Sequence, residues 1–413
     1  MVILFLHQNF PGQFAHLAPA LAAAGHRVVA LTSRFEESTR WRGVEVIAYR
    51  YDTPEGRKLH PWSSTFDSAV DRGATVFRAC EALKARGLNP DVIVAHSGWG
   101  EALFLRHVWP GARIGVFAEF FYQAEGADIG FDPELAGPEI GRSARVEMKN
   151  LAMRLQLETA DAAITPTHWQ AEMHPPELRR KISVAFDGID TDAIRPDARA
   201  ELTLPGHGTF RPGEEIVTFV NRNLEPYRGF HVFMRALPDL LRARPQARVV
   251  IVGEDGVSYG TPPASGGSWK QALLDEVRDR IPDADWARVH FTGRIGREDF
   301  TRLLQVSRVH VYLTYPFVLS WSLIEAMSAG CAIVASDTAP VREAIRDGEN
   351  GLLFDFFDGQ RMVALVDRLM DDPAERIALG QAARQRAVQD YDLQRVCLPA
   401  QFRWIEAQSR SSA

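Results

Sequence analysis

The strongest constraint on the fold is a repeated alternation between short apolar runs and amphipathic helical patterns. The apolar run 1–6 is followed by a helical pattern near 13–24, which ends at Gly25, and by a second apolar run at 27–32. This order predicts a strand, a helix and a second strand. Similar apolar runs follow at 91–95, 114–118, 161–165, 181–185, 216–220, 247–252, 289–291, 309–313 and 332–335. Such alternation is typical of a mostly parallel sheet covered by helices on both faces, so the sequence predicts an α/β chain.

A stretch rich in proline, glycine and charge separates two sets of strands. It falls within 191–214 and is predicted to be a linker between two folded halves. We therefore expect two doubly wound, Rossmann-like domains, 1–190 and 215–390, that face one another across a cleft. The tail 391–413 is expected to pack back on the first domain. Ligands of such sheets bind at the carboxyl ends of the strands, so functional residues are expected in the loops that follow them.

Bulk composition excludes several classes of protein. The 413 residues carry a formal net charge of −6, which argues against a nucleic-acid-binding protein held by phosphate neutralisation. The three cysteines, Cys80, Cys331 and Cys397, are far apart and lack the paired spacing of a zinc or redox site, which fits the reducing cytoplasm. No apolar run is long enough to cross a bilayer, so any membrane contact is expected to be peripheral.

The first loop of the second half places two guanidinium groups after a predicted strand. Arg222 and Arg228 lie in the segment 221–229, which ends at Gly229 and precedes a helical pattern. Arginine can fork onto phosphate oxygens, and the glycine lets backbone amides approach the same anion. The segment is predicted to bind a diphosphate, with a solvated arginine pair as the alternative.

A second candidate is the helix that follows the predicted strand 309–313. Its amino terminus offers free amides to an anion, and Glu325 lies about one turn in. A carboxylate there can accept hydrogen bonds from a ribose diol. The alternative is a glutamate that only favours the helix dipole. Gly253 and Gly293 end two further strands and permit a tight turn or a close ligand approach.

Other patterns argue against a nicotinamide enzyme and against a metal centre. The loop 8–13, which contains Gly12, resembles a flexible loop at the mouth of a binding site. It lacks the G-x-G-x-x-G fingerprint of dinucleotide dehydrogenases. The spacing D-x-D occurs at 190–192 and 283–285 in turn-like sequence, so solvated turns are favoured over a magnesium site. No G-x-S-x-G or H-E-x-x-H motif occurs, and we expect neither a metal nor another cofactor.

Acid–base and basic groups stand out in the first half. The candidates for acid–base work are His7, His96, Glu119 and Glu125. Of these, His96 and Glu119 lie just beyond predicted strands, where burial can raise the pKa of a glutamate towards neutrality. A purely structural role is the alternative for each. Arg142, Arg145 and Lys149 place three cations near one face of a predicted helix. That face is open to three interpretations: a solvated surface, contact with an anionic acceptor, or contact with a membrane.

Because several of these motifs occur together and in the same order, the chain resembles the nucleotide-sugar glycosyltransferases of family 4, a retaining group with the GT-B fold of two Rossmann domains. The resemblance spans residues 1–395. Its most specific parts are the turn 186–190, similar to the family's N-G-[VI]-D, and the pair Arg222 and Arg228. Agreement continues through 291–293, 325–330, 335–337, Glu343 and 347–353.

The resemblance implies roles for the matching residues. Arg222 and Arg228 would bind the donor diphosphate, and Glu325 would hold the ribose hydroxyls. Because the family's reaction depends on electrostatic stabilisation of the departing diphosphate, the two arginines are the expected catalytic centre. The resemblance further implies that phosphate and sugar are enclosed by Leu319, Ser320, Trp321 and Ser322, and that the base pocket is lined by Gly253, Arg294 and Ile295. Two further substrate contacts are expected from Gly12 and His96.

Two positions depart from the family's pattern. The E-x₇-E motif would place its first glutamate at position 317, where this sequence has Phe317, which cannot hydrogen-bond a sugar hydroxyl. An apolar ring there favours a deoxy or otherwise less polar donor sugar. Glu119 stands in place of the family's histidine near the donor sugar, either as a base or as a group that orients the sugar.

The sequence thus predicts a retaining glycosyltransferase that moves a sugar from a nucleoside diphosphate to an acceptor in the cytoplasm. The acceptor is open: a polysaccharide end, a lipid-linked glycan, a protein and a small molecule all fit, within cell-surface glycan or glycoconjugate synthesis. Two alternatives stay open: a nucleotide-sugar 2-epimerase on the same fold, and a non-catalytic protein that binds nucleotide sugars.

Overall fold

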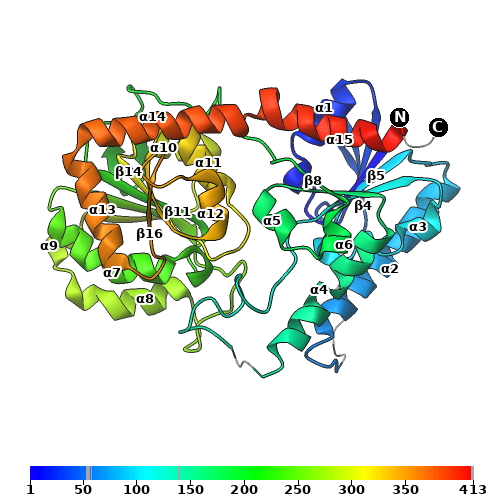
Figure 1. Ribbon diagram of the computed structural model, residues 1–413, viewed down its shortest axis with the longest axis horizontal. Helices are drawn as coiled ribbons and strands as arrows, with labels where there is room; N and C mark the ends of the chain where they lie inside the picture. Colours follow the sequence, from blue (N-terminus) through cyan, green and yellow to red (C-terminus); the bar gives the residue numbers. More distant parts are fainter. Residues whose placement is uncertain (53–55, 57, 138–139, 411–413) are drawn as a thin grey trace. The chain divides into compact units, whose positions relative to one another are not determined.

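The computed structural model describes residues 1–52, 56, 58–137 and 140–410, and it divides the chain into two units (Figure 1). Unit 1 comprises Met1–Gly188 and Gln394–Ala413, and unit 2 comprises Ile189–Leu393. Each unit is an α/β domain built on one main sheet, which confirms the predicted fold class.

The sheet of unit 1 has eight strands in the order β3-β4-β2-β1-β5-β6-β7-β8. The strands are β1 (Val2–Leu6), β2 (Arg27–Thr32), β3 (Thr39–Trp41), β4 (Val44–Ala48), β5 (Val92–His96), β6 (Arg113–Phe117), β7 (Ala162–Thr165) and β8 (Ile182–Val184). All neighbours pair in parallel except β3 and β4. The central strand β1 is an unbroken apolar run because helices cover both of its faces. Strand order reverses between β1 and β5.

The helices of unit 1 lie on both faces of this sheet (Figure 1). They are α1 (Leu17–Ala23), α2 (Ser64–Ala85), α3 (Leu105–Val108), α4 (Arg142–Thr159), α5 (His168–Glu172), α6 (Pro176–Arg179) and α15 (Leu398–Arg410). Helices α2, α3 and α4 pack together on one face, and α1 and α15 contact each other on the opposite face. Within the described ranges, no helix is both long and apolar enough to span a membrane.

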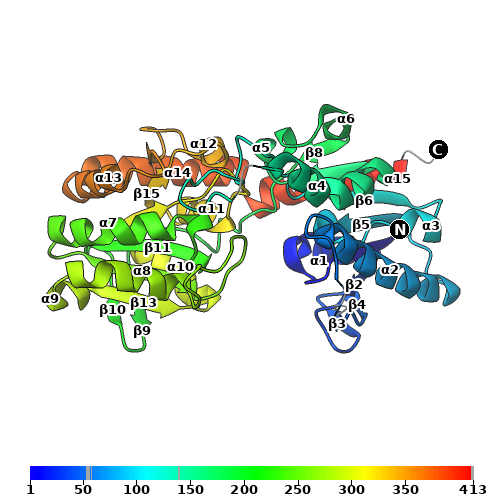
Figure 2. The same cartoon turned by 90° about the horizontal axis from the view of Figure 1, so that it is seen from below.

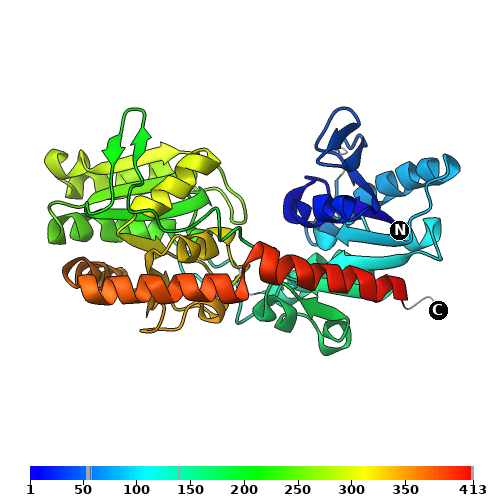
Figure 3. The same cartoon turned by 90° about the horizontal axis from the view of Figure 1, so that it is seen from above.

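The carboxyl-terminal helix α15, red in Figure 3, belongs to unit 1. Its Trp404 ring lies against Gly115 of β6, where a Cβ atom would sit only 2.6 Å from Cη2 of Trp404. Nε2 of Gln401 donates a hydrogen bond to the carbonyl oxygen of Phe186 at 2.8 Å. The last helix therefore completes the packing of the first sheet.

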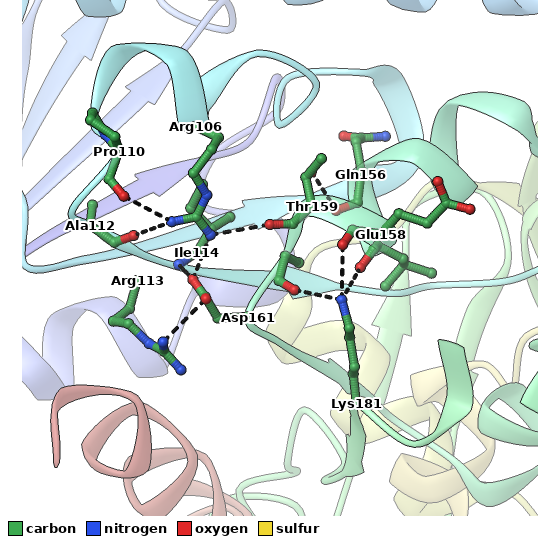
Figure 4. A network of polar contacts seen from close by, with 12 residues as sticks. Arg106, Pro110, Ala112, Arg113, Ile114, Gln156, Glu158, Thr159, Asp161 and Lys181 are labelled. Atoms are coloured by element: carbon green, nitrogen blue, oxygen red, sulfur yellow. Dashed lines mark hydrogen bonds and ion pairs between the residues drawn. The ribbon is translucent and has the colours of Figure 1, made fainter. Parts of the chain in front are cut away.

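A polar network joins β6, β7 and β8 at the amino-terminal side of these strands (Figure 4). The Asp161 carboxylate accepts hydrogen bonds from Nη2 of Arg106 at 2.7 Å and from the backbone nitrogen of Ile114 at 2.8 Å. Nζ of Lys181 donates to the carbonyl oxygens of Leu157, Glu158 and Ala160. Lys181 thereby satisfies carbonyl groups at the carboxyl end of α4 that have no partner within the helix.

Unit 2 has a parallel sheet of six strands in the order β13-β12-β11-β14-β15-β16. The strands are β11 (Ile216–Asn223), β12 (Arg248–Glu254), β13 (Val289–Gly293), β14 (Val309–Tyr312), β15 (Ala332–Ser336) and β16 (Leu352–Phe354). Strand order reverses between β11 and β14. In an open α/β sheet this reversal leaves a crevice at the carboxyl ends of the two strands, which is the usual place for a ligand.

Helices cover both faces of the second sheet as well (Figure 1). They are α7 (Phe230–Ala243), α8 (Trp269–Val277), α9 (Asp283–Trp286), α10 (Arg297–Val306), α11 (Trp321–Ser328), α12 (Ala339–Ala344), α13 (Gly359–Asp371) and α14 (Pro373–Asp390). Helix α7 packs against α8 and α13, whereas α11 packs against α14.

The segment 191–214, predicted to be a linker, lies inside unit 2 and contains a two-stranded hairpin. Its strands, β9 (Leu202–Leu204) and β10 (Gly208–Phe210), lie beside β13 in Figure 2. Leu202, Leu204 and Phe210 are buried against residues of β11, β12 and α10. The proline, glycine and charged residues of this segment lie in its turns, while three inward-facing apolar residues pack it against the core.

Candidate functional site

The first candidate site lies where strand order reverses in unit 2. Arg222 is near the end of β11, and Arg228 lies in the short 3-10 helix Pro226–Arg228 that follows. The Arg222 side chain is exposed and makes no hydrogen bond or ion pair with the residues that the structure describes. Its guanidinium can therefore bind an anion without breaking an existing contact.

Arg228 is buried and holds the neighbouring loop. Its Nη1 donates to Oγ1 of Thr314 at 2.7 Å and to the carbonyl oxygen of Val318 at 3.0 Å. The guanidinium carbon lies 5.3 Å from the centroid of the Tyr259 ring. Arg228 thus fixes the segment between β14 and α11 and adds a permanent positive charge at the strand ends.

The start of α11 is anchored by side-chain hydroxyl groups. Oη of Tyr312 accepts a hydrogen bond from the backbone nitrogen of Ser320 at 3.1 Å, and Oγ of Ser320 accepts one from that of Ser322 at 3.3 Å. Leu319 is buried, whereas Trp321 is 42% exposed. The four residues predicted to enclose phosphate and sugar therefore include one apolar anchor, two hydroxyl groups at the helix start and one exposed aromatic ring.

Glu325 lies on α11 with only 5% of its surface exposed. Its Oε1 accepts a hydrogen bond from Nη1 of Arg297, on α10. Burial raises the pKa of Glu325 above the usual glutamate value, and the charge and hydrogen bond of Arg297 act in the opposite direction. Arg297 therefore helps a buried carboxylate to stay ionised.

The three residues expected around a base differ in environment. A Cβ atom on Gly253 would lie 2.6 Å from Cδ2 of Leu224, so this glycine is required for close packing of the loop after β11. Ile295 is partly buried and packs on the hydrophobic core of unit 2. Arg294 is exposed. The glycine thus has a packing role, and the arginine side chain is accessible to a ligand.

Phe317 lies in an aromatic cluster with Tyr227, Tyr259 and Tyr315. Its ring centroid is 5.6 Å from that of Tyr227 and 5.0 Å from that of Tyr259, and the Tyr227 and Tyr315 centroids are 4.8 Å apart. Phe317 is only 3% exposed. The position that carries a glutamate in the family pattern is thus filled by a ring packed among tyrosines.

Glu225 organises the loop that carries Tyr259. Its buried carboxylate accepts hydrogen bonds from the backbone nitrogens of Ser258, Tyr259 and Gly260 at 3.0, 3.2 and 3.0 Å. Three donors on one carboxylate fix both the loop and the tyrosine beside Arg228.

A second candidate site lies in unit 1, where strand order reverses between β1 and β5. His7 follows β1, His96 ends β5 and Glu119 follows β6. The His7 and His96 ring centroids are 4.9 Å apart. The geometry thus brings together three of the four acid–base candidates, His7, His96 and Glu119.

Hydrogen bonds assign one tautomer to each of these histidines. Nδ1 of His7 accepts from the backbone nitrogen of Asn9 at 2.9 Å, so the proton of the neutral ring is on Nε2, which lies 2.8 Å from Oε1 of Gln13. Nδ1 of His96 accepts from the backbone nitrogen of Gly98 at 3.0 Å. Burial lowers the pKa of His7 to about 4 and places that of His96 well below its usual value. Both rings are therefore neutral at physiological pH.

Glu119 is the accessible end of this network. Nε2 of Gln13 donates to its Oε1 at 3.3 Å, and its Oε2 lies 3.9 Å from Nε2 of the fully buried His96. About a third of the Glu119 side chain is exposed, at 32%. Gly12 packs against His7, because a Cβ atom there would lie 2.3 Å from Nε2 of that ring. The Glu119 side chain is therefore accessible to a ligand. His96 is buried and Gly12 packs against His7, so these two residues hold the network in place.

A cavity of about 490 Å³ opens beside the segment that follows β6. Trp169, Glu125, Glu172 and Gln123 contribute to its lining. Aromatic rings and carboxylates in one cavity suit a polyhydroxylated molecule, since the ring contacts C–H groups and the carboxylates accept from hydroxyl groups.

The two D-x-D sequences serve local structure. Oδ1 of Asp190 accepts from the backbone nitrogen of Ala193 at 2.9 Å, and Asp285 forms an ion pair with Arg288 at 2.6 Å. Across the described ranges, no cluster of three or more histidine, cysteine, aspartate or glutamate residues is arranged to hold a metal ion.

Sequence reasoning missed Arg297, Glu225 and Gln13 as parts of these sites. Each is a polar residue in or just after a loop that follows a strand, which is the signal that could have selected it. Their partners lie 28, 33 to 35 and 106 residues away in the sequence, so the pairings required the fold.

Comparison with known proteins agrees with this architecture. A family model described as "Glycosyl transferase family 4 group" matches residues 24–194, and one described as "Glycosyl transferases group 1" matches residues 205–386. The glycogen synthase of Mycobacterium tuberculosis is 27% identical over 404 residues, which cover 92% of this chain and 87% of that protein.

Two solved structures share the fold along essentially the whole chain. Sucrose-phosphate synthase from Thermosynechococcus elongatus has a TM-score of 0.72 at 20% identity, covering 100% of both chains. HepE of Anabaena, in complex with UDP-glucose, has a TM-score of 0.67 at 16% identity, covering 99% of this chain and 100% of that one. The chain therefore has the GT-B fold and belongs to the glycosyltransferases, with an N-terminal domain of the family 4 group and a C-terminal domain of group 1.

Proposed function

We propose that this glycosyltransferase binds a nucleoside-diphosphate sugar on unit 2 and transfers the sugar with retention of its anomeric configuration. The observation that carries the proposal is an unengaged Arg222 together with a buried Glu325 carboxylate around the same strand reversal. The first suits a diphosphate and the second a ribose diol. The UDP-glucose bound to HepE, which shares the fold, supports this class of donor.

Charge develops on the diphosphate as the bond to the sugar breaks. In the proposed mechanism Arg222 stabilises this charge directly, and Arg228 adds a fixed positive charge while it positions the segment before α11. The departing phosphate oxygen takes the proton of the acceptor hydroxyl, so the protein supplies no nucleophile. Glu119, held by Gln13, is the proposed group that orients the acceptor.

The acceptor is proposed to be a glycan end, a lipid-linked glycan or a small molecule, in the cytoplasmic synthesis of cell-surface glycans. The 490 Å³ cavity beside Trp169, Glu125 and Glu172 supports a hydroxyl-rich acceptor. The transfer is proposed to need no resident metal, because arginine side chains supply the positive charge at the donor and the D-x-D carboxylates hold turns and ion pairs.

Release of UDP from UDP-glucose over a panel of sugar and glycan acceptors tests the proposal. We expect release to depend on acceptor and to fall roughly 100-fold in Arg222→Ala, as for loss of one donor to a developing oxyanion. Arg302→Ala, which removes an exposed arginine of α10, is the matched control. Acceptor-independent conversion of the sugar would indicate the 2-epimerase instead. Binding without turnover on any acceptor would indicate the non-catalytic protein. That alternative is retained because Phe317, packed among tyrosines, replaces the glutamate of the family pattern.

A further inference from the structure

We propose that a cavity in unit 1, beside the first turns of α4, binds a phosphate group. Its volume is about 280 Å³, and Arg142, Arg145 and Lys149 contribute to its lining together with Gly130 and Val146. Among the described residues that line it, none is a carboxylate. Assigning the phosphate to the acceptor rests on the proposed function, whereas the binding site itself does not.

The three cations converge because of their spacing on one helix. Arg142, Arg145 and Lys149 are three and four residues apart, which places neighbouring side chains on the same face of α4. The first turn of α4 carries no acidic residue. The arginines therefore add positive charge at the helix end that is already positive, an arrangement that an anion in the cavity stabilises.

Arg142 lies directly against the backbone of the loop before α4. Gly130 has a φ of +75°, and a Cβ atom there would lie 2.8 Å from Nη1 of Arg142. The glycine thus makes room for the guanidinium. Nη2 of Arg142 donates to the carbonyl oxygen of Gly137 at 3.4 Å, and Arg142 forms no ion pair with the described residues. Its remaining N–H groups can fork onto phosphate oxygens.

Arg145 and Lys149 both contact neutral groups, and burial lowers the pKa of Lys149 while the charge of the Asp128 carboxylate acts in the opposite direction. Nη1 of Arg145 donates to the carbonyl oxygen of Ile140 at 2.9 Å, and Nζ of Lys149 lies 3.5 Å from the centroid of the Tyr122 ring. Asn150 in turn holds Tyr122 by accepting from its backbone nitrogen at 2.9 Å and donating to its carbonyl oxygen at 2.8 Å. Tyr122, which contacts Lys149 of the basic cavity, is therefore in the same loop as Glu119, three residues further along the chain.

Phosphate monoesters and diphosphates match this chemistry, since each presents several anionic oxygens to guanidinium and ammonium donors. The phosphate has two chemical sources, a water-soluble phosphorylated acceptor and a phospholipid headgroup. Inorganic phosphate and a soluble sugar phosphate represent the first. Vesicles of phosphatidylcholine with or without phosphatidic acid represent the second.

The full chain is titrated with inorganic phosphate and with glucose 6-phosphate by calorimetry, and vesicle binding is measured by flotation. The test variant is Arg142→Gln with Arg145→Gln, and Lys149→Gln is a second, independent variant. The control is Arg86→Gln, which removes an exposed arginine at the end of α2 in the same unit. Melting curves and nucleotide affinity of unit 2 establish that each variant is folded.

We expect the double variant to bind the phosphate probe about tenfold or more weakly, because two charge-assisted hydrogen-bond donors are lost, with the control unchanged. Loss of soluble phosphate binding assigns a soluble source, and loss confined to phosphatidic acid vesicles assigns a lipid source. Binding that survives in folded double and Lys149→Gln variants, or no binding of any probe to the wild type, overturns the proposal. If the chain binds phosphate but releases no nucleotide in an acceptor-dependent way, the phosphate-site proposal stands and the proposed transferase mechanism is wrong.

Discussion

Arg297 of α10 donates a hydrogen bond to Oε1 of Glu325, a buried carboxylate on α11. Burial alone raises the pKa of Glu325, and Arg297 counteracts part of that rise. The exposed arginine therefore sets the charge of the group proposed to hold the ribose.

Removing this arginine should make nucleotide binding depend on pH. In Arg297→Ala the pKa of Glu325 rises further, so a larger fraction of the carboxyl groups is protonated at neutral pH. We predict weaker nucleotide binding at neutral pH that recovers when the pH is raised by about two units, as protons leave Glu325. Calorimetric titration over a pH series measures this. Arg302→Ala should show the wild-type profile, and a pH-independent loss in Arg297→Ala would contradict the prediction.

Glu225 should control the order of the loop at Tyr259. Glu225→Ala removes the acceptor of three backbone N–H groups, and we predict a loss of roughly 1–3 kcal/mol in the free energy of unfolding. Amide hydrogen exchange at 258–260 should accelerate at the same time. Glu254→Ala, an exposed residue at the end of β12, is the control. Unchanged exchange at 258–260 would show that the carboxylate does not hold the loop.

Phe317 should influence donor choice. We predict that the wild type prefers a deoxy-sugar donor and that Phe317→Glu shifts preference towards a fully hydroxylated hexose, because a carboxylate accepts from sugar hydroxyls. Since Phe317 is buried, Phe317→Leu controls for packing: it should cost stability but leave the preference unchanged. Competition between paired donors measures the ratio of kcat/KM. A wild type that prefers the hydroxylated hexose, with no shift in Phe317→Glu, would refute the hypothesis.

The buried histidines should weaken the fold in mild acid. Burial lowers the pKa of His7 and His310 to about 4, below the usual histidine value of 6.5. Between these values the two rings bind more protons in the unfolded chain than in the folded one, so their contribution to the free energy of unfolding falls as the pH drops from 6.5 towards 4. Urea unfolding over a pH series measures the slope, which His310→Gln should reduce. If the free energy of unfolding does not change with pH over this range, the claim that the buried rings are neutral in the folded protein is contradicted.

Much of the fold could be predicted from the sequence because the central strands are unbroken apolar runs. The predicted run 309–313 is β14 at Val309–Tyr312, and 216–220 lies within β11. The strands β3, β4 and β16 were not predicted. β3 and β16 have only three residues, which carry too little periodicity, and Glu45 interrupts the apolar run of β4. The hairpin in 191–214 was hidden by its turn-forming composition, although its buried leucines alternate with an exposed threonine.

The candidate sites were predictable at the level of strand ends but not of side-chain partners. Position after a strand selected Arg222, Arg228, Glu119 and Glu325. It did not reveal that Arg228 is buried and bound to the next loop, nor that Arg297 pairs with Glu325, because such contacts depend on which loops the strand order brings together.

The central claim is that unit 2 binds a nucleoside-diphosphate sugar through Arg222 and Glu325. Thermal-shift measurement of the full chain with UDP, GDP, ADP, TDP and their common sugars tests it most directly, since a specific ligand stabilises the native state by mass action. We predict a clear rise in Tm with one nucleotide family that Arg222→Ala and Glu325→Gln abolish. No shift with any nucleotide, or a shift that both variants retain, would contradict the claim.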